Sequence, residues 1–199
     1  ARVDASIAIN EYTDHLEKIL TDCGYAALLG ENPDRPKIES IKSEADIALR
    51  LQGIVNNRSS SWQARFMASE FLYRYVDMTL HSQCDRASLQ DSYFQALRHN
   101  YTGNGVDWGF GKGPNDIGIL GLMVVDWGKD VEAFRFGLDD ERLLTMNFFG
   151  RTPAYFRPPY RVKDFSALIL GRAHGLVVDL TGSPEDRDRA IASLAGSFL

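Results

Sequence analysis

The stretch TGNGVDWGFGKGPND, residues 102–116, separates two parts of the chain that differ in hydrophobic pattern. Its five glycines and its proline are incompatible with a regular helix or strand, so they predict a loop over 102–115. Before this loop, apolar residues recur at three- and four-residue steps; after it, they form short continuous or alternating runs. We therefore expect a single domain over 1–199, with a helical subdomain at 1–100 and a mainly β subdomain at 116–199.

Four helices are predicted in the first part of the chain. Apolar residues with a helical period cover 9–23, 41–55 and 60–78, and the third of these segments is rich in large rings. A fourth helix is expected over 89–97, behind Ser88, which together with Asp91 resembles a capping box.

Strands are predicted after the loop. The run GILGLMVV at 118–125 is continuously apolar, and segments 131–136 and 144–148 follow after turns. Shorter strands are expected at 167–170 and 176–180, and a last helix begins with Ser183 as N-cap and Pro184 at its first position. The sequence therefore predicts an α+β fold, in which an N-terminal layer of about four helices packs on a C-terminal antiparallel β-meander with a closing C-terminal helix.

Composition and charge exclude several classes of protein. The chain has 199 residues, 44% of them hydrophobic, and a net charge of −5, which is typical of a globular protein. Because acids and bases are spread evenly, binding to nucleic acid or to an anionic membrane is not expected. The longest apolar run is far shorter than a membrane span. Two cysteines, Cys23 and Cys84, suit free thiols, and we expect a soluble protein, cytoplasmic rather than secreted or periplasmic.

No cofactor or metal is expected from the motifs. The glycine-rich loop has Trp108 and Pro114 where the dinucleotide-binding pattern needs its third glycine, and Lys112 is followed by glycine rather than by the Ser or Thr of a phosphate-binding loop. The four histidines are scattered and lack the spacing of zinc ligands.

The segment RTPAYFRPPYRVKDF, residues 151–165, differs from the rest of the sequence because it combines arginines, aromatic rings and prolines. Arginine and tyrosine contribute strongly to protein interfaces, and proline lowers the entropy lost on binding. We therefore predict a non-catalytic protein-binding module, an adaptor or a partner-neutralising protein, with an exposed loop at 151–165 and a protein partner. The expected binding residues are Tyr155, Phe156, Arg157, Tyr160, Arg161 and, from the glycine-rich loop, Trp108.

Two other functions remain open. The first is a thiol hydrolase of the amidase or protease type, in which Cys84, just before a predicted helix, is the nucleophile and His174, next to a predicted strand, is the base. The second is a sensory domain that holds a small molecule between helices and sheet, suggested by the rings of the third predicted helix.

Overall fold

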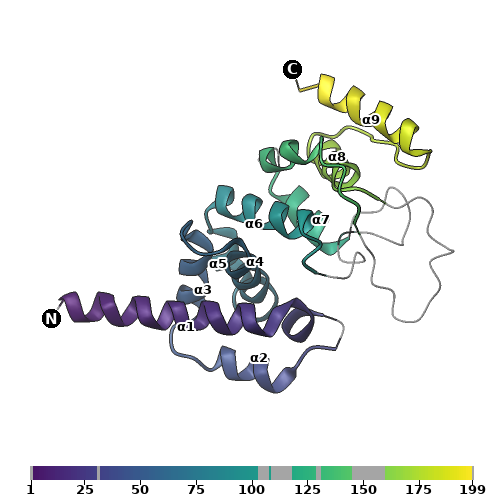
Figure 1. The fold of residues 1–199 in the computed structure, drawn as a ribbon. Helices are drawn as coiled ribbons and strands as arrows, with labels where there is room; N and C mark the ends of the chain where they lie inside the picture. Colours follow the sequence, from purple (N-terminus) through teal and green to yellow (C-terminus); the bar gives the residue numbers. More distant parts are fainter. Residues whose placement is uncertain are drawn as a thin grey trace. The chain divides into compact units, whose positions relative to one another are not determined.

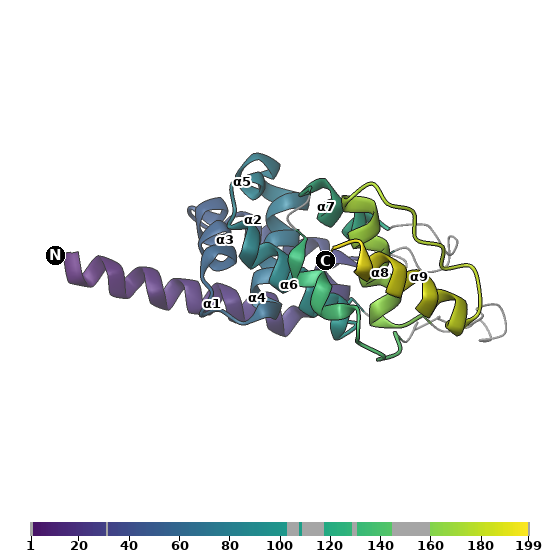
Figure 2. The same ribbon diagram turned by 90° about the horizontal axis from the view of Figure 1, so that it is seen from above.

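The structure, a computed structural model, describes residues 2–30, 32–102, 108, 118–128, 131–144 and 160–198, with the backbone alone for 2–13. The chain divides into two compact units, Ala1–Ser92 and Tyr93–Leu199, and the boundary lies within one helix. Figures 1 and 2 show helices joined by irregular segments in the described part of both units.

The first unit contains five α-helices, one π-helical turn and the start of a sixth helix: α1 (Arg2–Leu29), α2 (Arg35–Lys42), α3 (Ile47–Asn56), α4 (Trp62–Phe71), η1 (Leu72–Val76), α5 (Met78–Ser82) and α6 (Arg86–Arg98). Several of these helices begin at a polar side chain that caps the first backbone N–H groups. Asp34 caps α2, Ser61 caps α4 and Asp77 caps α5. The core lies where α4 packs against α1 and α3.

The π-helical turn η1 holds the C-terminal end of α1. Gly24, with φ of 70°, interrupts the helical backbone of α1 five residues before its end. Arg74 then donates from Nη1 to the carbonyl of Leu29 at 3.0 Å, and the hydroxyl of Tyr75 donates to the carbonyl of Leu28 at 2.9 Å. These bonds satisfy carbonyls that have no partner within a helix end, so the π-helical turn has a structural role.

The expectation of a helical first half is confirmed, with differences in detail. The predicted helix at 60–78 is split into α4, η1 and α5, because Asp77 takes an extended backbone conformation. The capping box at Ser88 is wrong: α6 begins at Arg86, and Asp85 accepts from the backbone N–H of Ala87. Ser88 is buried and donates to the carbonyl of Val55.

The second unit contains the end of α6, α7 (Ile119–Asp126), the 3-10 helix η3 (Glu132–Gly137), α8 (Val162–Ala173) and α9 (Pro184–Gly196). Helices α8 and α9 lie side by side in both ribbon views (Figures 1 and 2). They run parallel, since Arg187 near the start of α9 contacts Asp164 near the start of α8, and Phe198 beyond the end of α9 contacts His174 at the end of α8. The predicted closing helix, with Ser183 as N-cap, is confirmed.

The predicted α+β fold with an antiparallel β-meander is wrong. Segments 118–125 and 131–136, expected as strands, form α7 and η3, and 167–170 lies within α8. The expected strand at 144–148 falls mostly outside the described residues. Among the described residues there is no sheet, and the β-type pairing that occurs is an isolated bridge between Leu143 and Arg161.

The lack of a polar face explains the wrong prediction for α7 and α8. Every residue of 162–171 is buried, so the sequence of α8 has no polar face from which a helical period could be recognised. In α7 every residue except Asp126 is apolar or glycine. Short continuous apolar runs are common to buried strands and buried helices. The strand expected at 176–180 is not formed either: these residues have no regular secondary structure, although Val178 and Leu180 are buried.

None of the described helices is long and apolar enough to cross a membrane, in agreement with the absence of a long apolar run in the sequence.

Candidate functional site

The predicted binding residues have different places in the structure. Tyr155, Phe156 and Arg157 lie outside the described residues. Tyr160 is half-buried, and Arg161 is only 7% exposed. Trp108 is 1% exposed, and its indole N–H is buried without an acceptor. In the structure Arg161 and Trp108 therefore contribute to the interior of the second unit, and Tyr160 lies at its edge.

Backbone hydrogen bonds hold both ends of segment 145–159 together. The N–H of Leu144 donates to the carbonyl of Tyr160, and the N–H of Val162 donates to the carbonyl of Arg142, each at 2.9 Å. Together with the bridge between Leu143 and Arg161, these bonds form an antiparallel pairing of 142–144 with 160–162, which we call the stem. Leu144 and Tyr160, which are separated by 15 intervening positions, are thus fixed next to one another, so the fold has already met part of the entropic cost of bringing them together.

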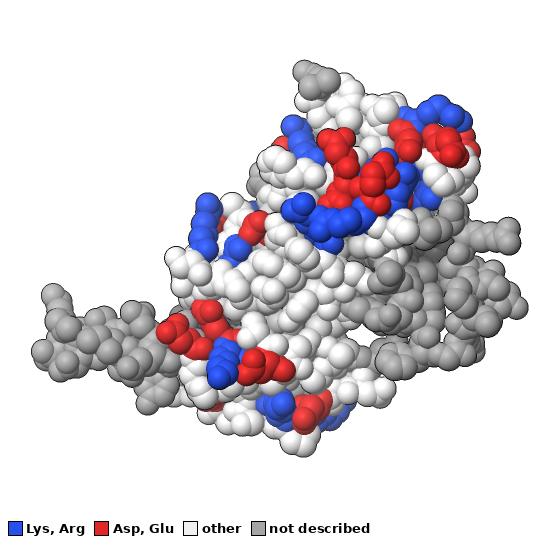
Figure 3. Space-filling model, viewed as in Figure 1, with Lys and Arg blue, Asp and Glu red and all other residues white. Residues whose placement is uncertain are grey.

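Side chains at the stem form a network of ion pairs. The guanidinium of Arg161 donates to Asp164 at 2.9 Å from Nη2 and at 3.2 Å from Nε, and Asp164 also accepts from the backbone N–H of Arg161. Glu141 and Asp188 each pair with both Arg161 and Lys163. Opposite charges therefore alternate through the network. We call these five residues the stem cluster: Glu141, Arg161, Lys163, Asp164 and Asp188. In the space-filling view, blue and red side chains lie next to one another over the second unit (Figure 3).

The stem cluster shifts the pKa of its two exposed acids. A hydrogen bond from Lys163 lowers the pKa of Glu141, and hydrogen bonds from Arg161 and then Lys163 lower the pKa of Asp188. Because both carboxylates are largely exposed, water screens these interactions and their contribution to stability is small. The buried centre of the cluster is Asp164, which is fully buried and also accepts from Nη1 of Arg187 at 2.7 Å.

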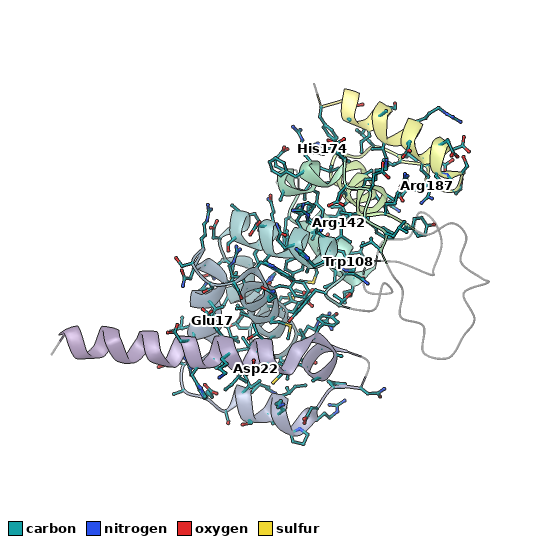
Figure 4. All side chains as sticks on the ribbon, in the orientation of Figure 1. Glu17, Asp22, Trp108, Arg142, His174 and Arg187 are labelled. Carbon is teal, nitrogen blue, oxygen red and sulfur yellow. The ribbon has the colours of Figure 1, made fainter. Side chains whose placement is uncertain are left out.

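The two residues of the predicted thiol hydrolase belong to different units. Cys84 is 6% exposed and lies just before α6, as expected, with its sulfur 3.6 Å from the carbonyl of Leu80. Burial raises the pKa of its thiol to about 11, which disfavours the thiolate that a nucleophile requires. His174 lies at the C-terminal end of α8, not beside a strand, and its ring packs on Phe198 with 4.7 Å between centroids (Figure 4). The Cys–His pair remains a prediction.

A second histidine, which the sequence analysis did not select, has a clearer environment. Nε2 of His81 lies 2.9 Å from Oγ of Ser69, and the ring of Tyr73 packs edge-on against the imidazole. A serine bonded to a histidine occurs in nucleophilic enzymes, but Ser69 is fully buried and His81 is 4% exposed, so no substrate reaches them in this structure. No motif in the sequence links these two residues, since the bond depends on the π-helical turn between them.

Neither metal-ligand geometry nor similarity to known proteins assigns a function to the chain. Within the described ranges, no group of three or more His, Cys, Asp and Glu side chains could hold a metal ion. The chain matches no protein-family model, no curated protein and no solved structure.

Proposed function

We propose that this protein is a non-catalytic protein-binding module that displays residues 151–159 to a protein partner from the rigid stem of the second unit. Tyr155, Phe156 and Arg157 are the proposed contact residues. Tyr160 and Arg161, at the end of the same sequence segment, then have a supporting role in the stem.

The observation that carries this proposal is the stem itself. Binding loops are commonly irregular segments held by a rigid scaffold, and ordering a loop on binding lowers its affinity. Two backbone hydrogen bonds and the stem cluster fix the residues on either side of 145–159. A partner that binds this segment therefore does not have to bring its two ends together.

The composition of the segment favours a protein as the ligand. Residues 145–159 contain two arginines, four aromatic residues and no acid. Large rings supply apolar contact area, and arginine donates bidentate hydrogen bonds to carboxylates. We therefore expect a partner surface on which apolar pockets are flanked by acidic side chains.

A photo-crosslinking experiment tests the proposal. We would introduce benzoylphenylalanine at Phe156 and, in a separate protein, at Phe136, an 82% exposed phenylalanine of η3 in the same unit. In extracts of the source cells, the probe at 156 should give a discrete adduct that the probe at 136 does not. The captured protein would then be purified and its affinity for the chain measured.

The affinity measurement decides the outcome. Changing Tyr155, Phe156 and Arg157 together to Ala should weaken binding by about tenfold or more and leave the melting temperature nearly unchanged. Arg189→Ala is the matched control, because Arg189 is 73% exposed and paired with Asp186, and it should leave affinity unchanged. Unaltered affinity in the triple variant would refute the assignment.

A further inference from the structure

Arg187 is a fully buried arginine with part of its hydrogen-bonding capacity unused. It lies in the first turns of α9, within the second unit, and its exposed fraction is 0% (Figure 4). Nη1 donates to Oδ2 of Asp164 at 2.7 Å, whereas Nε and Nη2 are buried and have no hydrogen-bond partner. Buried polar groups in native proteins almost always have partners, so this arrangement needs an explanation.

The two unpartnered nitrogens share one edge of the guanidinium. The N–H of Nε and an N–H of Nη2 point in the same direction, because the group is planar and Nη2 lies on the side away from Cδ. This edge is the fork that donates two parallel hydrogen bonds to the two oxygens of a carboxylate or phosphate. A carboxylate or phosphate group would therefore satisfy both N–H groups of Arg187 at once.

Asp164 links Arg187 to the ion pairs of the stem cluster. Asp164 is the fully buried acid of the stem cluster, and it accepts hydrogen bonds from both Arg161 and Arg187. Glu141 and Asp188, which pair with Arg161 and Lys163, have exposed fractions of 65% and 44%. Asp164 is therefore the buried carboxylate that Arg161 and Arg187 share, while Glu141 and Asp188 balance the remaining positive charge nearer the solvent.

Tyr160 connects this site with the surface. The guanidinium carbon of Arg187 lies 5.2 Å from the centroid of the Tyr160 ring, which stacks over the cation. Tyr160 is half-buried and packs edge-on against Phe165. Tyr160 thus contacts the face of the guanidinium on one side and solvent on the other.

We propose that the Nε–Nη2 edge of Arg187 is a binding site for a small oxyanion, either a carboxylate or a phosphate group. The bound anion accepts both hydrogen bonds of this edge. This site lies in the interior of the second unit and does not depend on the proposed function of residues 151–159, so either proposal can fail alone.

Nuclear magnetic resonance of the arginine side chains tests the proposal on the intact chain. Inorganic phosphate and acetate would be titrated separately, with sodium chloride at equal ionic strength as the reference. The Nε–H resonance of Arg187 should shift saturably with at least one anion and not with chloride. A shift with phosphate alone assigns a phosphate group, and a shift with acetate alone assigns a carboxylate.

Two variants identify the resonance and its ligand. Arg187→Lys keeps a positive charge but removes the fork, so it should remove the resonance and weaken anion binding by about tenfold or more. Arg189→Lys, at an exposed position two residues away, should change neither. If Arg187→Lys does not fold, nuclear Overhauser contacts with the Tyr160 ring identify the resonance in the unaltered protein.

Two results would overturn this proposal. The first is an Arg187 resonance that neither anion shifts. The second is an Arg187 Nε–H that has the chemical shift of a carboxylate-bonded group even in anion-free protein. In that case an acid of the chain itself would accept the hydrogen bonds of the Nε–Nη2 edge.

Discussion

His81 is a buried imidazole whose protonation is opposed by its surroundings. Burial, and after it the positive charge of Arg86, lowers the pKa of His81 from 6.5 to about 4. The bond with Ser69 and the edge-on contact with Tyr73 fix the ring in a position that suits the neutral form. The folded protein therefore binds the His81 proton more weakly than the unfolded chain does, and folding stability becomes pH-dependent.

We expect the free energy of unfolding to fall as the pH is lowered from about 6.5 to about 4, since in this window the unfolded state binds the proton and the folded state does not. His81 therefore makes the free energy of unfolding about 3 kcal/mol higher above pH 6.5 than below pH 4. Urea denaturation at a series of pH values measures it. His81→Gln should flatten the slope, and His15→Gln, at an exposed histidine, should preserve it. Equal slopes in all three proteins would contradict this account.

Arg161 and Asp164 illustrate what the sequence could and could not reveal about the site. They are three residues apart at the start of α8, and a helix places such pairs on one face. Glu141 and Asp188, in contrast, lie 20 and 27 positions from Arg161, and tertiary structure alone brings them together. The basic segment was recognised from its composition, but the expectation that Arg161 faces a partner depended on a fold that the sequence pattern does not determine.

At the scale of elements, Gly171 allows the irregular segment 176–180 to lie close to α8. A Cβ at this position would lie 2.5 Å from Cγ2 of Val178 and 3.1 Å from the carbonyl oxygen of Leu176. Both atoms belong to the segment that joins α8 to α9, and Val178 is itself 5% exposed. The glycine is therefore needed for packing, although it lowers the intrinsic stability of the helix.

We expect Gly171→Ala to destabilise the protein by about 1–3 kcal/mol, because the segment has to move away from α8. Gly53→Ala is the matched control in α3: no atom lies within 4 Å of the new Cβ, so the change should stabilise the protein by about 0.5–1 kcal/mol. Denaturant titration measures both values. Adding Val178→Ala to Gly171→Ala should recover part of the stability lost through the overlap between the two side chains. If the two substitutions instead lower the stability additively, this overlap is not the cause of the loss.

The contrast between the two halves of the chain has one physical cause. Helices of the first unit keep exposed polar side chains, and Glu39 and Lys42 of α2, for example, form an ion pair beside the buried Ile38 and Ile41. Such helices show their period in the sequence. Helices α7 and α8 are buried on nearly all sides or apolar throughout, so periodicity gives no information about them. The prediction thus failed for α8, which is buried on nearly all sides, and for α7, whose exposed residues Ile119 and Leu122 are apolar as well.

At the scale of the molecule, one helix contributes to both units. In the first half of α6, Ser88 and Asp91 accept hydrogen bonds from Arg65 of α4. In its second half, Tyr93 packs against Trp127 and Phe94 packs against Phe134 of η3. A helix of 13 residues is marginal in water, so each half depends on packing to stay helical. Unfolding of one unit therefore removes support from the part of α6 that the other unit uses.

We expect the two units to unfold in a single transition for this reason. Fluorotryptophan resonances of Trp62 in the first unit and Trp127 in the second would follow urea unfolding of the intact chain. Their midpoints should coincide, and Gly53→Ala, confined to the first unit, should raise both by roughly 0.3–0.5 M. Gly171→Ala, confined to the second unit, should lower both. A shift of Trp62 alone in the first variant, or of Trp127 alone in the second, would mean that α6 frays at the boundary and that the units are energetically independent.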